Sequence, residues 1–184
     1  MDPRADLVRH YRWLRRYGLN DSHSGNASVR EGDTIWITPT GACADTLEPD
    51  ALVRCDIDGT IGPGASLDAP LHVRVYQRNP EARAVLHAHG PYSIVTTLHA
   101  ETFEPIDFEG RYYFERVPVV AIPAAEYLRR APDEVARLLA DHRVAVVQGH
   151  GVFAQGESIN LAYKWLCSLE SSARLAWLDA QGRR

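Results

Sequence analysis

Two histidines separated by one residue are the most chemically informative feature of the sequence. His87 and His89 lie in the apolar run 84–89, which predicts a strand that ends where Gly90 turns the chain. Residues i and i+2 of a strand point to the same side, so both imidazoles would leave one face of a sheet. Paired imidazoles suit Zn²⁺ or a similar transition ion. Two hydrogen-bonded histidines at a strand end are the alternative.

A third histidine, His150, lies between Gly149 and Gly151, directly after the apolar run 144–148. The run predicts another buried strand, and the glycines let backbone approach closely while leaving the ring unobstructed. Ligands of open α/β sheets gather outside the carboxyl ends of strands, so two neighbouring strands would bring the three imidazoles together. Three protein ligands with an open position are the catalytic zinc arrangement. A histidine of an ordinary turn is the alternative.

An acidic residue, Asp68, precedes a helix predicted over 71–78. A carboxylate beside a metal ion can act as a ligand, as an acid or base, or as both in sequence. By itself, a cap for the helix that starts near Pro70 is the commoner role for such a residue. His72 is predicted to be a helix residue near this acidic loop rather than a ligand.

Two loops are rich in small polar residues that favour anion binding. They are Ser-Gly-Asn-Ala-Ser at 24–28 and Thr-Pro-Thr-Gly at 38–41. Such residues let backbone N–H groups converge on a phosphate or carboxylate, although similar clusters also form ordinary turns. His23 lies beside the first loop, where a substrate contact is one possibility and an exposed loop histidine is the other.

The bulk composition excludes several protein classes. The 184 residues are 45% hydrophobic and 24% charged, with a net charge of −4, as expected for a globular protein without a basic stripe for nucleic acid. No apolar run approaches the roughly 20 residues of a membrane-spanning helix. The N-terminal segment lacks the apolar stretch of a secretion signal, and the three cysteines form no CxxC pair. We therefore expect a cytoplasmic protein with reduced thiols and one domain over 1–184.

The elements that must position these residues alternate between strands and helices. A helix is predicted from its cap at Asp2 to Gly18, with an apolar stripe that includes Tyr17. The other predicted helices cover 71–78, 91–98, 132–139 and 158–179, and the predicted strands cover 27–30, 34–38, 53–57, 60–61, 84–89, 117–122 and 144–148. Strands 27–30 and 34–38 would form one hairpin, and 53–57 and 60–61 another through Asp58-Gly59. Strands in both hairpin and helix-separated contexts predict a three-layer α/β sandwich with a mixed sheet.

Taken in order, these motifs resemble the class II aldolase/adducin family. Ser-Gly-Asn at 24–26, Thr-Pro-Thr-Gly at 38–41, an acid at 68, His-x-His at 87–89 and Gly-His-Gly at 149–151 match it in register over about residues 7–178. The resemblance implies a three-layer α/β/α sandwich whose central mixed sheet is largely antiparallel. It also implies a homotetramer that acts on a small-molecule substrate.

The resemblance assigns roles to particular residues of this chain. The metal ligands would be His87, His89 and His150, holding Zn²⁺, with Mn²⁺ or Co²⁺ as alternatives. The substrate pocket would be formed by Gly25, Asn26, Thr40, Gly41 and Ser66. Asp68 would take the place of the acid/base of the family, which is usually a glutamate. The activity would be cleavage of a carbon–carbon bond in a hydroxy-carbonyl substrate, such as a sugar phosphate, through a metal-stabilised enediolate.

Three departures from the family pattern keep other activities open. Asp68 is one methylene shorter than glutamate, and Leu67 replaces a pocket hydroxyl. The tyrosine proton donor has no clear counterpart, since Phe108 lies near its position and Tyr112 or Tyr113 would have to replace it. A decarboxylase, which does not need that donor, and a sugar-phosphate dehydratase are the alternatives within the family. A non-catalytic adducin-like scaffold, in which the metal residues should be eroded, is the alternative outside enzymes.

Overall fold

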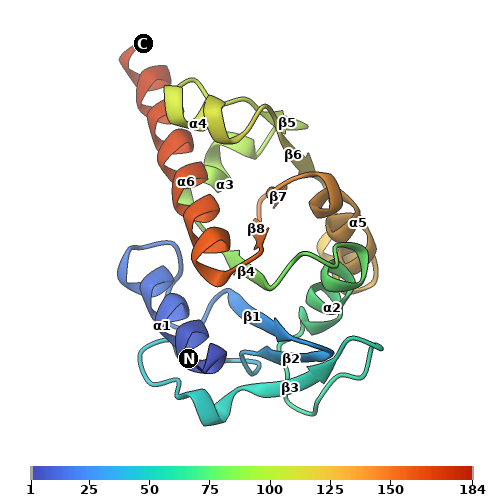
Figure 1. Ribbon diagram of the computed structural model, residues 1–184. Helices are drawn as coiled ribbons and strands as arrows, with labels where there is room; N and C mark the ends of the chain where they lie inside the picture. Colours follow the sequence, from blue (N-terminus) through green and yellow to red (C-terminus); the bar gives the residue numbers. More distant parts are fainter. Residues whose placement is uncertain (1, 184) are drawn as a thin grey trace.

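Eight strands form one sheet in the computed structural model, which describes residues 2–183 (Figure 1). The strands are β1 (Asn26–Glu31), β2 (Thr34–Ile37), β3 (Val53–Asp56), β4 (Ala84–Ala88), β5 (Thr102–Phe103), β6 (Val117–Val120), β7 (Val144–Val147) and β8 (Gly151–Gly156). Their order is β3-β2-β1-β4-β8-β7-β6-β5. Only β6 and β7 pair in parallel among these strands, so the sheet is mixed and largely antiparallel, as predicted.

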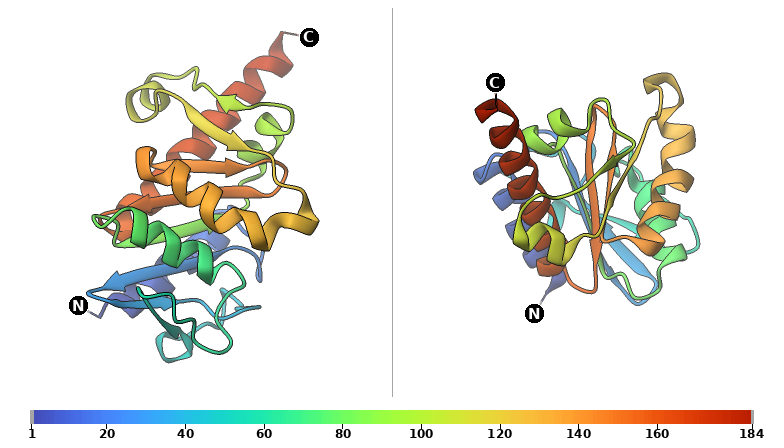
Figure 2. Two further views of the ribbon diagram at one scale, coloured as in Figure 1. Left: turned by 90° about the vertical axis from the view of Figure 1, so that its right-hand side faces the viewer. Right: turned by 90° about the horizontal axis from the view of Figure 1, so that it is seen from above.

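Helices cover both faces of the sheet and complete three layers (Figure 2). One face carries α2 (Ala69–Arg78) and α5 (Tyr127–Asp141), which pack against each other. The other face carries α1 (Pro3–Arg16), α3 (Pro91–Thr97), α4 (Phe108–Tyr113) and α6 (Ile159–Gly182). Short 3-10 helices cover Pro49–Ala51 and Ala124–Glu126. The predicted α/β/α sandwich is therefore confirmed.

Alternation along the central strands decides which side chains face which helical layer. Val144 and Val146 of β7 join the core beneath α1 and α6, whereas Ala145 and Val147 join the core beneath α2 and α5. Phe153 of β8 also faces the α2/α5 layer. Because side chains alternate across a strand, this pattern separates the apolar core residues into two sets, one beneath each helical layer.

Most predicted elements are present, with shifted ends. Asp2 caps α1, as expected, by accepting a hydrogen bond from Arg4 N. Ser158, the predicted first residue of the last helix, caps α6 by accepting one from Leu161 N. The predicted strand at 60–61 is wrong: β3 pairs with β2 instead, and Asp58-Gly59 only turns the chain. Tyr17 was predicted in the buried stripe but is 63% exposed.

Two errors concern elements that surround the site. Helix α5 begins at Tyr127, five residues before the predicted start, and contains Pro132 in its interior. Proline removes the hydrogen bond to the carbonyl of Leu128, but Leu128 is 59% exposed, so water can reach this part of the helix. Strand β8 was not predicted, because its run 151–156 is bounded and interrupted by glycine and glutamine.

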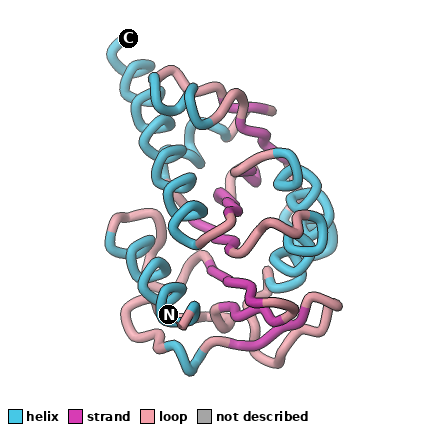
Figure 3. The backbone as a smooth tube through the Cα atoms, viewed as in Figure 1, coloured by secondary structure: helices cyan, strands magenta, loops and turns pink. Residues whose placement is uncertain are grey.

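Long loops connect β2 to β3 and β3 to α2 (Figure 3). These loops carry the Thr-Pro-Thr-Gly motif and the segment that ends at Asp68, and a β-bridge joins Pro39 to Ala65. Residues 2–183 contain no helix with both the length and the apolar composition that crossing a bilayer requires.

Candidate metal centre

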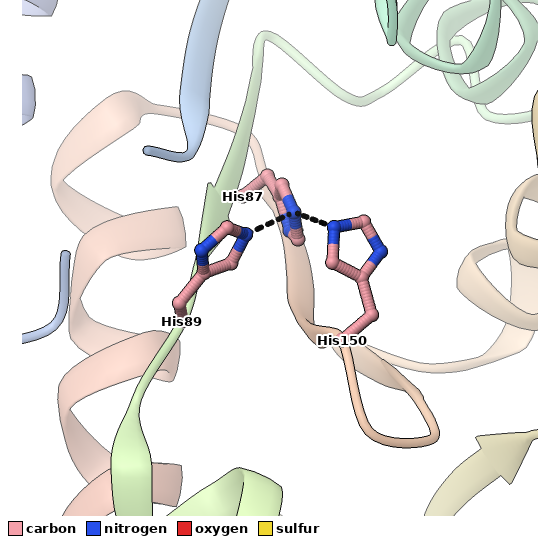
Figure 4. Close-up of side chains that lie close together, drawn as sticks. All are labelled: His87, His89 and His150. Carbon is pink, nitrogen blue, oxygen red and sulfur yellow. Dashed lines mark hydrogen bonds between the residues drawn. The ribbon is translucent and has the colours of Figure 1, made fainter. Parts of the chain in front are cut away.

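Three imidazoles point toward one another at the carboxyl ends of β4 and β7 (Figure 4). The Nε2 atom of His87 lies 2.9 Å from Nε2 of His89 and 3.4 Å from Nε2 of His150. The three ligand atoms all lie within 4.8 Å of one another. Nitrogens about 2.0–2.1 Å from a tetrahedral ion are about 3.4 Å apart, so the cluster fits a single divalent ion.

The local backbone explains how the three rings meet. His87 is the penultimate residue of β4, His89 follows that strand directly, and His150 lies in the turn between β7 and β8. The prediction that neighbouring strands supply the ligands is wrong in one respect, because β8 lies between β4 and β7. A Cβ atom at Gly151 would come within 2.8 Å of His89 Cδ2 and 2.5 Å of the carbonyl of Ala88, so only glycine allows this approach.

His87 is the most rigidly held of the three. It is 1% exposed, and its ring stacks flat on Phe153, with ring centroids 4.0 Å apart. The Nδ1 atom lies 3.0 Å from the carbonyl oxygen of Val152, which can only accept a hydrogen bond, so Nδ1 carries the proton. The Nε2 lone pair of His87 therefore points at the other two rings.

Burial keeps the three imidazoles neutral. It holds the pKa of His87 well below its usual value, and the neighbouring His89 and His150 lower this pKa further. Burial also lowers the pKa of His89 and of His150. Neutral imidazoles with converging lone pairs are what a divalent transition ion requires of its ligands.

Asp68 occupies the capping position of α2 but does not cap the helix. Its side chain makes no hydrogen bond to the first turn and is 8% exposed. Instead, Oδ2 accepts a hydrogen bond of 2.7 Å from Nδ2 of Asn26, and Oδ1 accepts one of 2.9 Å from the hydroxyl of Tyr127. The carboxylate is thus held by side chains from β1 and α5 rather than by its own helix.

Tyr127 connects Asp68 to the imidazole cluster. Its ring lies edge-on to that of His150, with centroids 4.7 Å apart, while its hydroxyl binds Asp68. Burial raises the pKa of Tyr127, and the charge of Asp68 raises it further, so the hydroxyl keeps its proton. Sequence reasoning missed this residue because the helix was predicted to begin at Pro132, which left Tyr127 in an unassigned loop.

The tyrosines considered from sequence lie elsewhere in the chain. Tyr113 of α4 packs against Trp165 of α6, with ring centroids 5.5 Å apart, and α4 covers the face of the sheet opposite α2 and α5. Tyr112 and Phe108 are 77% and 86% exposed. Within this chain, neither Tyr112 nor Tyr113 lies beside Asp68.

The residues predicted to bind an anion gather on the β1/β2 side of the imidazoles. Asn26 pairs with His87 across β1 and β4. Gly25, with φ +68°, packs so closely that a Cβ atom would lie 2.5 Å from the carbonyl of His87. The amide of Asn26 is engaged with Asp68, which the motif alone did not indicate.

The other predicted pocket residues lie in two loops that bind each other. The backbone N–H of Thr40 donates to the carbonyl of Gly64, and that of Ser66 donates to the carbonyl of Thr38. Thr40 and Gly41 are exposed, whereas Ser66 is 8% exposed. Thr40 and Gly41 thus form an accessible polar loop, which lies next to the buried segment of Ser66 and Asp68.

The remaining histidines of the region have other surroundings. His72 is fully buried in α2, as a helix residue near the acidic loop, and its Nδ1 lies 2.7 Å from Ser28 Oγ, which lies 2.7 Å from the hydroxyl of Tyr76. Burial lowers the pKa of His72 to about 4. His23 is exposed, and its Nδ1 lies 2.8 Å from Ser22 Oγ.

A hollow of about 790 Å³ lies between α1 and the loop 45–49, away from the imidazoles. It is lined by several arginines, of which Arg12 binds Glu48 at 2.7 Å and Arg15 lies 4.0 Å from Asp45. Its size alone does not make it the site, because it lacks the convergent side chains of the imidazole cluster.

Comparisons with known proteins agree with this geometry. Residues 5–177 match the family described as "Class II Aldolase and Adducin N-terminal domain". The chain is 30% identical to the L-fuculose phosphate aldolase of Methanocaldococcus jannaschii, over 84% of each chain. It is 26% identical to the 3-oxo-tetronate 4-phosphate decarboxylase of Pectobacterium atrosepticum, over 95% of this chain and 84% of that one.

Solved structures agree as well. The crystal structure of L-fuculose-1-phosphate aldolase from Thermus thermophilus superposes with a TM-score of 0.89 at 32% identity, covering 97% of this chain and 96% of that one. The family match spans most of the chain and includes the three imidazoles and Asp68. The chain therefore belongs to the class II aldolase and adducin family.

Proposed function

We propose that the protein is a divalent-metal-dependent lyase that cleaves a carbon–carbon bond in a small hydroxy-carbonyl substrate with an anionic end, such as a sugar phosphate. The observation that carries this proposal is the convergence of three neutral imidazoles next to a buried carboxylate. A non-catalytic scaffold has no use for either, and burying both groups without a function would destabilise the fold.

Each residue of the site has a separate task in this proposal. His87, His89 and His150 would hold the ion, which supplies Lewis acidity to a carbonyl and an adjacent hydroxyl oxygen. Asp68 would accept and return the proton of the reacting carbon or oxygen. Tyr127 and Asn26 each donate to one oxygen of Asp68 and so fix the plane of its carboxylate.

The polar loops would hold the anionic end of the substrate. Gly25, Asn26, Thr40, Gly41 and Ser66 lie on the β1/β2 side of the imidazoles. Backbone N–H groups of Gly-containing loops suit a phosphate or carboxylate. The relatives named for phosphorylated substrates support this placement.

Decarboxylation is the second candidate. Among the described residues around Asp68, the tyrosine hydroxyl in contact with the carboxylate is that of Tyr127, and it already donates to Asp68. A reaction that releases CO₂ needs no separate group to protonate an aldehyde oxygen, so this arrangement suits it. The decarboxylase relative points the same way.

One experiment separates the two candidates. The Zn²⁺-, Mn²⁺- and Co²⁺-loaded protein would be incubated with L-fuculose phosphate and, separately, with 3-oxo-tetronate 4-phosphate. Release of an aldehyde, detected through its enzymatic reduction, supports the aldolase. Release of CO₂ supports the decarboxylase. Absence of both products with these and related hydroxy-carbonyl acids would contradict the proposal.

A further inference from the structure

His89 is held differently from the other two imidazoles. His87 belongs to β4 and stacks on Phe153, and the ring of His150 lies edge-on to Tyr127. His89 follows the end of β4 and is half-buried, and its ring lies against those of His87 and His150, the other members of the cluster. The position of this third ring therefore depends on how the backbone is fixed on either side of residue 89.

The loop after α1 fixes the backbone N–H of His89. This N–H donates to the carbonyl oxygen of Leu19 at 2.8 Å and to Oδ1 of Asn20 at 2.9 Å. Asn20 is 6% exposed, and its own backbone N–H donates to the carbonyl of Leu14 in the last turn of α1. One side of His89 is thus tied to the end of α1.

On its other side, His89 leads into α3 through Gly90 and Pro91. Gly90 occupies the capping position of α3 but has no side chain that could cap it, and Pro91 has no N–H. The first free N–H groups of the helix are therefore those of Tyr92 and Ser93. Ser93 is 1% exposed, so its N–H needs a partner within the protein.

A carboxylate from α6, which lies beside α3, supplies the missing cap (Figure 1). Oε1 of Glu170 accepts a hydrogen bond of 2.9 Å from the N–H of Tyr92. Oε2 accepts one of 2.9 Å from the N–H of Ser93 and one of 2.6 Å from its hydroxyl. A Cβ atom at Gly90 would lie 2.3 Å from Oε2, so a side chain there would displace the carboxylate. The negative charge also suits the positive end of the helix dipole.

On the basis of the proposed function, we propose that Glu170 is a positioning residue that fixes His89 in the metal centre. The connection is short, because only two residues separate His89 from Tyr92. Without the carboxylate, the buried N–H of Ser93 would lack a partner, and the first turn of α3 would shift or unwind to reach water. His89 would move with it, and its Nε2 would leave the place where it lies 2.9 Å from Nε2 of His87. Contacts behind the ligands orient metal sites in this way.

Substitution of Glu170 tests the proposal through metal binding rather than activity. Glu170→Gln keeps the size of the side chain but removes its charge and replaces one accepting oxygen with an N–H donor. Competition with a chromophoric chelator would measure the affinity for Zn²⁺, and the visible absorption of bound Co²⁺ would report the arrangement of its ligands. We expect Zn²⁺ to bind about tenfold more weakly, the lower end of the effect of losing a group that supports a ligand. The Co²⁺ bands should shift or lose intensity.

Ser93→Ala gives a graded second variant. It removes the hydroxyl that donates to Oε2 of Glu170 but keeps both backbone hydrogen bonds to the carboxylate. We expect a smaller loss of Zn²⁺ affinity and a smaller spectral change, in the same direction as for Glu170→Gln.

Two further variants separate positioning from a general loss of stability. Ser158→Ala removes the cap of α6, which follows the end of β8 that pairs with Ala84, away from the imidazoles. It should lower the midpoint of thermal unfolding but leave the Zn²⁺ affinity and the Co²⁺ spectrum unchanged. Glu157→Gln makes the same chemical change as Glu170→Gln at an exposed position and should alter none of these quantities. Circular dichroism would verify that each variant is folded.

The outcomes distinguish this inference from the proposed function. Wild-type affinity and spectrum in Glu170→Gln, or a loss of affinity that Ser158→Ala reproduces, would overturn the inference and leave the lyase proposal intact. If Glu170→Gln is not recovered folded, a wild-type spectrum and affinity in Ser93→Ala would overturn it instead. Failure of the wild type to bind either ion would count against the metal centre itself, and the inference would fall with it. Changes confined to the variants of Glu170 and Ser93 support the assignment.

Discussion

The hydroxyl of Tyr127 donates a hydrogen bond of 2.9 Å to Oδ1 of Asp68, although the two residues are 59 positions apart in the chain. The bond joins the start of α5 to the loop before α2, and the same tyrosine ring lies against His150. The side chain of Tyr127 therefore fixes the position of the carboxylate relative to the metal centre. Substitution of Tyr127 can test this link.

Replacement of Asp68 tests the acid/base role. Asp68→Asn keeps the shape of the side chain and an oxygen for the Tyr127 hydroxyl but removes the basic group. We expect turnover to fall by ~10²–10⁴-fold, the usual contribution of a positioned acid or base. Steady-state kinetics would measure this, with circular dichroism as the control for folding. Near-normal turnover would remove Asp68 from the mechanism.

A double-mutant cycle tests the coupling between Tyr127 and Asp68. Tyr127→Phe keeps the ring against His150 and removes only the hydroxyl. A hydrogen bond to a charged group contributes about 1.5–3 kcal/mol, so we expect kcat to fall about tenfold or more. In the Asp68→Asn background the same change should have little effect, and Tyr112→Phe should have none in either. Additive losses would mean that Tyr127 acts independently of Asp68.

Loss of metal on mutation tests the three imidazoles. His150→Ala and His87→Ala should each abolish stoichiometric binding of a divalent ion, because two nitrogens cannot replace three. The exposed His99 provides the control, and His99→Ala should keep its metal. Elemental analysis after dialysis would quantify the ion. Wild-type protein that cannot be loaded with Zn²⁺, Mn²⁺ or Co²⁺ would contradict the site.

His72 should make the protein less stable in mild acid. Its pKa is lowered from 6.5 to about 4 by burial, so the folded protein favours the neutral ring. Below pH 6.5 the unfolded chain binds more protons than the folded one, and the stability that is fully present above this pH is lost as the pH falls toward 4. The loss from this one group is about 3 kcal/mol.

The corresponding experiment compares denaturant unfolding of the wild type and His72→Asn between about pH 7 and about pH 4, the window set by the unfolded and folded pKa values of this ring. Both proteins would be measured with a chelator, so that metal release does not add to the slope. The variant should show a weaker dependence on pH by about one proton, since asparagine does not titrate. Identical pH dependence of the two proteins would show that His72 is not buried as a neutral ring.

The exposed apolar residues of α4 test the predicted assembly. Phe108 and Tyr112 are 86% and 77% exposed, and large exposed aromatic side chains are typical of protein interfaces. We expect a homotetramer in sedimentation experiments and a smaller species for the double variant Phe108→Ser/Tyr112→Ser. A wild-type monomer at all concentrations would refute this prediction.

The positions of the imidazoles could be predicted from sequence because they depend on short-range rules. Alternation along β4 places His87 and His89 on one side, and the glycines around His150 indicate an uncovered ring at a strand end. The fold class could also be predicted from local features. Helix caps such as Asp2 and Ser158, and the spacing of apolar residues within each element, depend only on residues close in the chain. That residues 1–184 form a single domain stays a prediction.

The surroundings of Asp68 could not be predicted, because they depend on contacts between distant segments. Its partners Asn26 and Tyr127 lie 42 and 59 positions away, and each has an ordinary local explanation, as a turn residue or as a loop aromatic. Pro132 suggested a helix start and so displaced Tyr127 from α5. Strand β8 was not predicted, because its glycine and glutamine residues interrupt the alternation of apolar and polar side chains. It lies between β4, which contains His87, and β7, which precedes His150.

The flat stack of Phe153 on His87 makes that ligand immobile, while His150 sits on a turn with glycine on both sides. The ring of His150 is in turn held edge-on by Tyr127. Phe153 and Tyr127 carry no ligand atom of the cluster, yet each supports one of its rings from the α2/α5 side of the sheet. The apolar core beneath that layer and the geometry of the metal centre are therefore parts of one packed unit, so a change in the first should be felt in the second.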